Sequence, residues 1–223
     1  MPRDLFAHSL SDLKTKMLRL GSDAAQTIGN GVEALKTRDR TLAQAIIDHD
    51  EEINRLRYQI EEDCFELIAT QQPMASDLRE IVSILLIAIE LERIADHSKN
   101  LAEIVIFMGN QPLLKPLIDI PRMATTCEEM LSQALDAFAR RDAELARAVC
   151  ARDDEIDYLY QQVFRELLTY IVEDPRVVSR ALNLLFAAHN LERIGDCITN
   201  IGERVIYAAT GKLEELNVQR PAE

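Results

Sequence analysis

The stretch LERIADHSKNLAE, residues 91–103, returns as LERIGDCITNIGE, residues 191–203, one hundred residues further along the chain. Both copies carry acidic and asparagine side chains at matching places: Glu92, Asp96, Asn100 and Glu103 in the first, and Glu192, Asp196, Asn200 and Glu203 in the second. On a helix that advances about 100° per residue, four such positions lie within an arc of about 80°. The sequence therefore predicts two equivalent helices, each with an acidic stripe along one side.

The repeat also includes the segment that precedes each acidic helix. Residues 34–56, ALKTRDRTLAQAIIDHDEEINRL, align with residues 137–159, AFARRDAELARAVCARDDEIDYL, at an offset of 103 residues. The offset falls to 100 by the acidic helices, so the first copy has three additional residues near TQQPMASD. Such a repeat predicts an all-α fold, a tandem repeat of two three-helix bundles with six long helices. We expect the first bundle within residues 1–110 and the second within residues 117–223.

Apolar periodicity and prolines give the expected limits of these helices. Apolar residues recur at three- and four-residue spacing from Phe6 to Ala24, which is typical of a helix that packs on neighbours. Proline interrupts a helix because it lacks a backbone N–H group, and Pro73, Pro116 and Pro175 stand between the periodic runs. The expected helices cover residues 4–36, 40–71, 75–109, 117–140, 142–172 and 175–210.

The composition is that of an acidic globular protein. Hydrophobic residues make up 48% of the 223 positions, and the formal net charge is −13 at pH 7. A charge of this sign argues against nucleic-acid phosphates or anionic lipid as the main binding partner. The four cysteines lack metal-type spacing and are expected to be buried free thiols of a reducing compartment: Cys64, Cys127, Cys150 and Cys197.

Two further features predict a cytoplasmic protein. The first ten residues, MPRDLFAHSL, lack the apolar core of a signal peptide. The most apolar stretch, IVSILLIAIELERIA, contains Glu90 and Glu92 too early to span a bilayer. We therefore expect a cytoplasmic location without direct insertion into a membrane.

A second pair of acidic motifs lies on the helix before each acidic helix. The segment DDEID supplies Asp153 and Asp157, and its counterpart DEEIN supplies Asp50 and Asn54. In an antiparallel hairpin, residues equidistant from the turn lie at one level. Positions 54 and 92 average 73, the position of a turn proline, and positions 157 and 192 average 174.5, beside another proline. Each bundle is therefore expected to carry its two acidic motifs at the same height on neighbouring helices.

Carboxylates gathered in this way suit hard or borderline cations such as Mg²⁺, Mn²⁺ or iron. Like charges four residues apart destabilise a helix, and a cation across the stripe would reverse that effect. The alternative is ordinary solvated acids, which Lys99, Arg93, Arg193 and Arg204 would partly neutralise. Asn100 and Asn200 are more typical of helix–helix hydrogen bonds than of ligands, and a lone His189 is more typical of packing.

Enzyme classes find little support in the sequence. A di-iron carboxylate enzyme of the four-helix type needs Glu-x-x-His on its core helices, and none of the four histidines has Glu three residues before it. The nucleotide-binding patterns GxxxxGK[ST] and GxGxxG are also missing from the sequence. Two alternatives to a metal-binding regulator stay open: a metal-free helical scaffold, and a carboxylate-bridged di-metal enzyme.

The chain resembles the PhoU family of phosphate-signalling proteins. The resemblance rests on LERIADH, LERIGD, QQPMASDLR, DHDEEIN, DDEID and the duplication itself, and it extends from about residue 6 to residue 211. It implies a tandem pair of three-helix bundles, assembled as a homodimer in the cytoplasm. It also implies a non-enzymatic negative regulator of phosphate uptake and of the phosphate-starvation response. The implied partners are the ATPase subunit of the phosphate ABC transporter and the phosphate-sensing histidine kinase.

The resemblance also implies metal sites, because some family members bind metal clusters through E(D)xxxD motifs. These motifs map here onto Glu92/Asp96, Glu192/Asp196 and Asp153/Asp157, while Asp50 is followed by Asn54 instead of an acid. The expected metal ligands are therefore Asp50, Glu92, Asp96, Asp153, Asp157, Glu192 and Asp196. The metal stays open among iron, manganese, zinc and magnesium, and the second bundle, with four acids, is expected to bind it more tightly.

Overall fold

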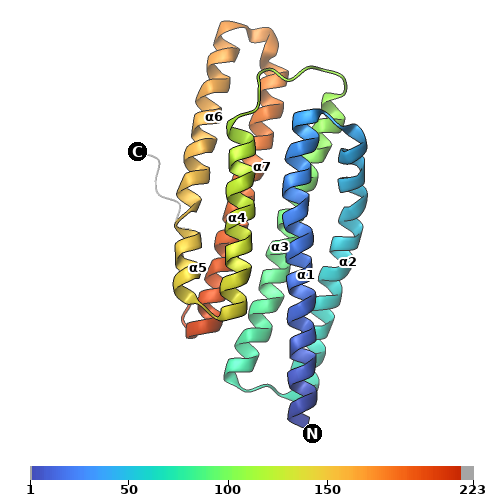
Figure 1. The fold of residues 1–223 in the computed structure, drawn as a ribbon, viewed down its shortest axis with the longest axis vertical. Coiled ribbons are helices and arrows are strands. Elements are labelled where there is room, and N and C mark those ends of the chain that lie inside the picture. Colours follow the sequence, from blue (N-terminus) through green and yellow to red (C-terminus); the bar gives the residue numbers. More distant parts are fainter. Residues whose placement is uncertain (1, 217–223) are drawn as a thin grey trace.

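The computed structural model describes residues 2–216, which form an elongated assembly of helices without a β-strand in the described range (Figure 1). The first half consists of α1 (Pro2–Thr37), α2 (Arg40–Gln71) and α3 (Ala75–Met108). The second half consists of α4 (Asp119–Arg140), α5 (Ala143–Cys150), α6 (Asp153–Glu173), the short 3₁₀ helix η1 (Pro175–Val177) and α7 (Val178–Thr210). The predicted all-α tandem repeat is confirmed, and the chain passes between the halves after Met108 and before Asp119.

The same capped turn precedes the second helix of each repeat. Arg38 and Arg141 both adopt left-handed backbone angles, with φ of 59° and 54°. The next residue caps the following helix in both cases: Asp39 accepts from two backbone N–H groups at 2.9 and 3.0 Å, and Asp142 accepts from Leu145 N at 3.0 Å. An aspartate at this position satisfies donors that the first helical turn leaves free. The repeated Arg-Asp pair therefore produces the same turn twice.

The second copy departs from the expected single helix over residues 142–172. It is divided at Ala151 and Arg152, where Arg152 N donates to Val149 O at 3.0 Å, a bond of the tighter 3₁₀ type. Asp153, Asp154 and Glu155 then occupy the first turn of α6, where acidic side chains favour a new helix start. The prediction of one continuous helix here was wrong, because the acidic run supplies a second N-terminus.

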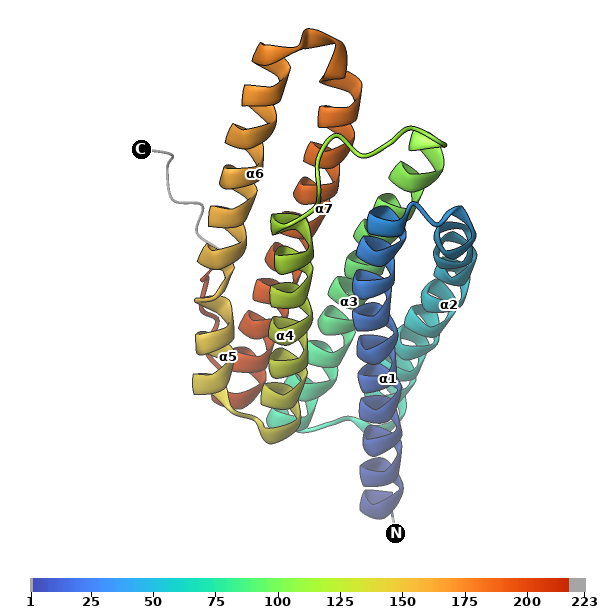
Figure 2. The same cartoon turned by 45° about the horizontal axis from the view of Figure 1, so that its top comes forward.

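Helices α3 and α7 lie side by side at the centre of the molecule, and they connect the two halves (Figures 1 and 2). Helix α1 packs against α3, α4 packs against α7, and α1 and α4 pack against each other. Helix α2 packs on α3 at one flank, while α5 and α6 pack on α7 at the other. Each acidic helix is therefore the central member of its half, with the preceding helix beside it as the hairpin argument requires.

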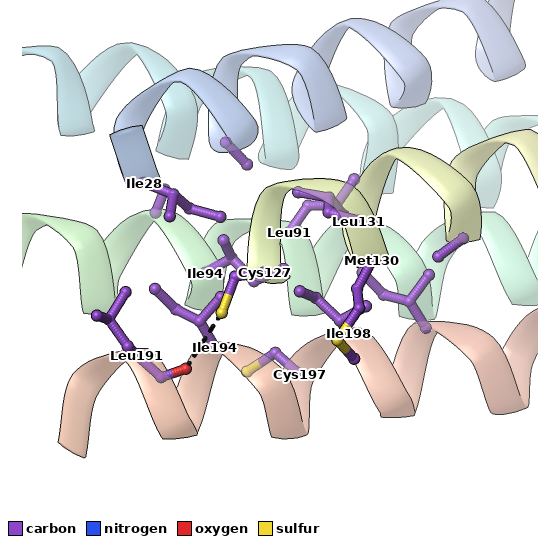
Figure 3. Close-up of a cluster of buried hydrophobic side chains, with 14 of the residues drawn as sticks. Ile28, Leu91, Ile94, Cys127, Met130, Leu131, Leu191, Ile194, Cys197 and Ile198 are labelled. Carbon is purple, nitrogen blue, oxygen red and sulfur yellow. Dashed lines mark hydrogen bonds between the residues drawn. The ribbon is translucent and has the colours of Figure 1, made fainter. Parts of the chain in front are cut away.

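One cluster of buried apolar side chains runs through both halves, and its central part is drawn in Figure 3. Leu91 and Ile94 of α3 face Leu191 and Ile194 of α7, and all four are fully buried. Cys127 of α4 donates its thiol proton to Leu191 O at 3.5 Å. The four cysteines of the described chain are free and buried, as predicted. The apolar face of each acidic helix thus forms the shared core, and its acidic face is left for other contacts.

A buried carboxylate also joins the halves. The Glu80 side chain on α3 is 5% exposed and meets Lys14 Nζ of α1 at 2.5 Å. Its other oxygen accepts from Arg141 at the end of α4, in the second half. A buried carboxylate needs such partners, because an unpaired charge would be strongly unfavourable there.

Candidate functional site

The second half brings four predicted acids into one region, which we call the second acidic set: Asp153 and Asp157 of α6, and Glu192 and Asp196 of α7. The Asp153 carboxylate lies directly over Gly195, where an added Cβ would stand 2.4 Å from Asp153 Oδ1. The missing side chain of Gly195 therefore lets α6 bring Asp153 next to Asp196. In the first half the equivalent position is Ala95.

Burial, with the mutual repulsion of neighbouring carboxylates as a second cause, determines the electrostatics of the second acidic set. Burial raises the pKa of Asp153 to about 7, and the charges of Asp157, Asp196 and Glu192 act in the same direction. Burial likewise raises the pKa of Glu192 to about 7, with support from Asp196 and Asp157 and opposition from Arg193. Burial and Asp196 also raise the pKa of Asp157. These shifts show that the four carboxylates lie within electrostatic reach of one another.

Polar neighbours of the second acidic set satisfy it only in part. Arg193 donates to Asp196 Oδ2 at 2.6 Å, an ion pair within α7. Glu192 Oε2 is buried without a hydrogen bond, although His189 Nδ1 lies 3.3 Å away. The Thr199 hydroxyl is also buried and favours the charged form of Asp153, but its geometry falls short of a full hydrogen bond. Burying oxygens in this way carries a free-energy cost that a bound cation would offset.

The first half also brings its predicted acids together, as the first acidic set: Asp50 of α2, and Glu92 and Asp96 of α3. Lys99 Nζ donates to Asp50 Oδ2 at 2.9 Å and lies 3.9 Å from Asp96 Oδ1. Asn54, the residue that departs from the motif, donates its amide to the same Asp50 oxygen at 3.0 Å. The hydrogen bond to Asp50 raises the pKa of Lys99, as do the charges of Asp50 and Asp96.

Glu92 completes the first acidic set beside a second cation. Burial raises the pKa of Glu92, and Asp96 and Asp50 add to that effect, whereas the positive charge of Arg57 lowers it. Arg57 Nη1 also donates to Glu61 Oε2 at 2.5 Å, which holds the guanidinium along α2. The first acidic set is therefore crossed by the Lys99 ammonium and approached by the Arg57 guanidinium.

The two acidic sets lie at equivalent positions of the repeat, but the residues next to them differ. Lys99 aligns with Thr199 at the offset of 100 residues, and Arg57 aligns with Tyr160 at the offset of 103. Tyr160 is close enough to Glu192 for that charge to add to burial in raising the pKa of the phenol. The sequence alone indicated Lys99 only as a partial neutraliser of solvated acids and did not indicate Arg57, although the alignment of the two copies contains the signal.

The arrangement of the carboxylates limits how a metal ion could bind in either acidic set. Across residues 2–216, no three acidic, histidine or cysteine side chains converge closely enough to hold a metal ion as they stand. The four carboxylates of the second acidic set nevertheless suit a hard cation, and one of their oxygens, Glu192 Oε2, is buried without a proton donor. In the first acidic set, the Lys99 ammonium already lies between the Asp50 and Asp96 carboxylates.

No helix among the described residues has the length and apolar character to cross a membrane.

Comparison with known proteins agrees with the duplicated architecture. The PhoU domain model matches residues 17–105 and again residues 120–205. A phosphate-specific transport system accessory protein PhoU homolog from Caulobacter vibrioides is 40% identical over 217 residues, covering 97% of this chain and 94% of that protein. The homolog from Pseudomonas aeruginosa is 39% identical over 209 residues, covering 92% of this chain and 86% of its own length.

Two solved structures share the fold along their whole length. The crystal structure of PhoU from Pseudomonas aeruginosa superposes with a TM-score of 0.89 at 38% identity, covering 93% of this chain and 100% of that one. The phosphate transport system regulatory protein PhoU from Streptococcus pneumoniae gives a TM-score of 0.87 at 30% identity, with coverage of 94% and 99%. Sequence, repeat structure and fold agree, and the chain belongs to the PhoU family.

Proposed function

We propose that this protein is a cytoplasmic accessory regulator of phosphate-specific transport, which restrains phosphate uptake and the phosphate-starvation response when phosphate is plentiful. The observation that carries the proposal is family membership along nearly the whole chain, with relatives named as accessory proteins of phosphate-specific transport. The protein acts by contact with other proteins and not by catalysis. Its partners are the ATPase subunit of the phosphate transporter and the phosphate-sensing kinase.

Exposed apolar side chains support a role in protein contact. Phe107 is 80% exposed near the end of α3, and Phe186 of α7 is 54% exposed. Together with Ile104 and Asn190 they line an open hollow of about 380 Å³ on the paired central helices. Large exposed apolar groups of this kind are typical of surfaces that bind other proteins. We assign this surface to partner binding, either in the homodimer or with the transport machinery.

We further propose that the second acidic set binds a metal ion when the protein is active. Asp153, Asp157, Glu192 and Asp196 would hold it, and the ion would supply the positive charge that these crowded carboxylates need. Asp196 would then exchange its contact with Arg193 for the ion. A metal-free scaffold is the competing function, and the Arg193–Asp196 and Lys99–Asp50 ion pairs favour it.

A gene-deletion experiment tests the regulatory role. Deletion should leave a phosphate-starvation reporter active in phosphate-rich medium and should increase phosphate uptake. The parent gene should restore repression, whereas a Phe107→Ser/Phe186→Ser variant should restore less, because it loses the apolar surface. Leu213, 70% exposed in the C-terminal segment, provides a matched control as Leu213→Ser. Unchanged reporter activity and uptake in the deletion strain would contradict the proposed role.

A further inference from the structure

The two acidic sets differ at three aligned positions, and each difference has the same electrostatic sign. The first set has Lys99 where the second has Thr199, Arg57 where the second has Tyr160, and Asn54 where the second has Asp157. Relative to the second half, the first half therefore gains the Lys99 ammonium and the Arg57 guanidinium, which is shared with Glu61, and loses one carboxylate. The Lys99 ammonium also lies between carboxylates of two different helices, Asp50 on α2 and Asp96 on α3.

We infer that Lys99 is the resident cation of the first acidic set, so that this half takes no metal ion and only the second half responds to metal. The inference rests on the proposed metal binding of the second half. It replaces the expectation that both halves hold metal, because the residues of the first half do not fit a divalent ion. The family motif is present there, but its charge is balanced from within the chain.

Contact geometry supports this assignment. The Asp50 side chain is 11% exposed and the Lys99 side chain 26% exposed, so the pair is well shielded from solvent. Charge interactions strengthen when water is excluded, which favours a close ammonium and repels a second cation at the same place. Asp50 Oδ1 is buried without a hydrogen bond, but Oδ2 of the same carboxylate receives both Lys99 and Asn54. A divalent ion at Oδ2 would have to displace both donors, and one shared between Asp50 and Asp96 would meet the Lys99 ammonium that lies between them.

The second half lacks a cation at the equivalent positions. Thr199 is 1% exposed, and its neutral hydroxyl faces Asp153 without a full hydrogen bond. Tyr160 is neutral beside Glu192, where Arg57 approaches Glu92 in the first half. A short neutral side chain in place of lysine leaves the position between α6 and α7 open to an ion from solution. The residue at position 99 or 199 thus makes the largest difference between the halves, and the changes at the other two aligned positions act in the same direction.

The first experiment isolates the first half with Asp157→Asn/Asp196→Asn, which removes two carboxylates of the second set. Titration of this variant with Mn²⁺ by calorimetry should show no binding tighter than millimolar. Adding Asn54→Asp and Lys99→Thr should create binding, with affinity increased by about tenfold to a hundredfold. Adding Asn54→Asp with Lys99→Arg is the matched control and should create none, because the cation is retained. Micromolar Mn²⁺ binding by the first variant, or no gain after the Lys99→Thr change, would overturn the inference.

The reciprocal change is Thr199→Lys in the otherwise unaltered protein. A lysine here should occupy the second acidic set and abolish Mn²⁺ binding, while circular dichroism shows unchanged helix content. If Thr199→Lys binds Mn²⁺ as the parent does, a lysine at this position does not exclude metal and the inference fails. Because Thr199 is 1% exposed, the longer lysine must fit a buried position, so the titration counts only for a variant that keeps the helix content of the parent.

A metal-free measurement separates the inference from the proposed metal function. In EDTA, Lys99→Thr should lower the melting temperature more than Lys16→Thr, because Lys16 forms a more exposed pair with Asp63 at 2.6 Å. If the parent binds no Mn²⁺ at all, metal binding by the second half is wrong, and the role of Lys99 is then decided by this melting comparison. Equal melting temperatures for Lys99→Thr and the parent would show that Lys99 does not balance the first set.

Discussion

The two acidic helices have the same fold and contrasting charge environments. Beside α3, Asp50 of α2 and Asp96 of α3 meet across the Lys99 ammonium, and Asn54 of α2 is an additional donor. Beside α7, the carboxylates of α6 and α7 lie together near Thr199, and burial raises the pKa of Asp153 and Glu192 to about 7. A duplicated motif thus preserves where its acids lie but not what neutralises them. Under our proposal, the residues one turn away from the motif decide whether the acidic set binds a cation from solution.

The buried apolar faces of α3 and α7 are equivalent, so substitutions in them should destabilise the protein to a similar extent. These substitutions have the largest expected effect on stability. Leu91 and Leu191 are equivalent, and both are 0% exposed in the shared core. Leu91→Ala and Leu191→Ala should each lower the free energy of unfolding by about 2–5 kcal/mol through loss of buried area and creation of a cavity. Chemical denaturation monitored by circular dichroism measures both. A loss below about 1 kcal/mol in one variant alone would show that the halves do not share an equivalent core.

The junction between the halves provides an intermediate effect. Glu80 is buried between Lys14 and Arg141, whereas its counterpart Arg180 takes no part in such a pair in the described ion contacts. Glu80→Gln should lower the free energy of unfolding by about 1–2 kcal/mol, because the buried group loses two charged partners that are themselves partly exposed. Arg180→Gln is the control and should be nearly neutral. Equal effects of the two changes in denaturant melts would contradict the asymmetry of the junction.

The pH dependence of the metal-free protein gives the smallest effect. The pKa of Asp153 rises from 3.8 to about 7 on folding, so the folded protein retains a proton that the unfolded chain releases. Stability should therefore fall as pH rises through this window, and the loss should be complete above about pH 7. Asp153→Asn removes this dependence and should stabilise the metal-free protein by about 1 kcal/mol at high pH after allowance for solvent screening.

Melting in EDTA at several pH values between about 5 and 8 measures this difference. The gap between Asp153→Asn and the parent should narrow toward the acidic end, where Asp153 is protonated. Asp50→Asn in the first half is the matched control, and it should destabilise, because Lys99 loses its partner. A parent protein that becomes more stable from about pH 5 to 8 relative to Asp153→Asn would contradict the charge crowding in the second half.

Much of the fold could be predicted from the sequence, because apolar periodicity identifies the helices, the repeat gives their order, and the prolines lie between them. The three helices of the first half begin and end within two residues of their expected limits: Pro2–Thr37, Arg40–Gln71 and Ala75–Met108. The break at Ala151 was missed, because apolar spacing continues across it and only the acidic run that follows indicates a new helix start.

The sequence was sufficient to predict where the acidic side chains lie, but not which cations pair with them. Equal distance from the turn placed Asp50 with Asp96 and Asp153 with Asp196 correctly, since hairpin geometry depends only on chain length. Which cation reaches which acid depends on side-chain conformation. Lys99 was expected only to neutralise solvated acids in part, but in the structure it reaches across to Asp50 of α2.

The most direct test of the central claim is the location of metal in crystals of the protein grown with Mn²⁺. Anomalous difference density at the manganese edge identifies bound ions independently of activity. We expect density between α6 and α7, beside Asp157 and Asp196, and none between α2 and α3, where Lys99 should remain bonded to Asp50. Density of equal height beside Asp50 and Asp96, or density in neither half, would contradict the claim.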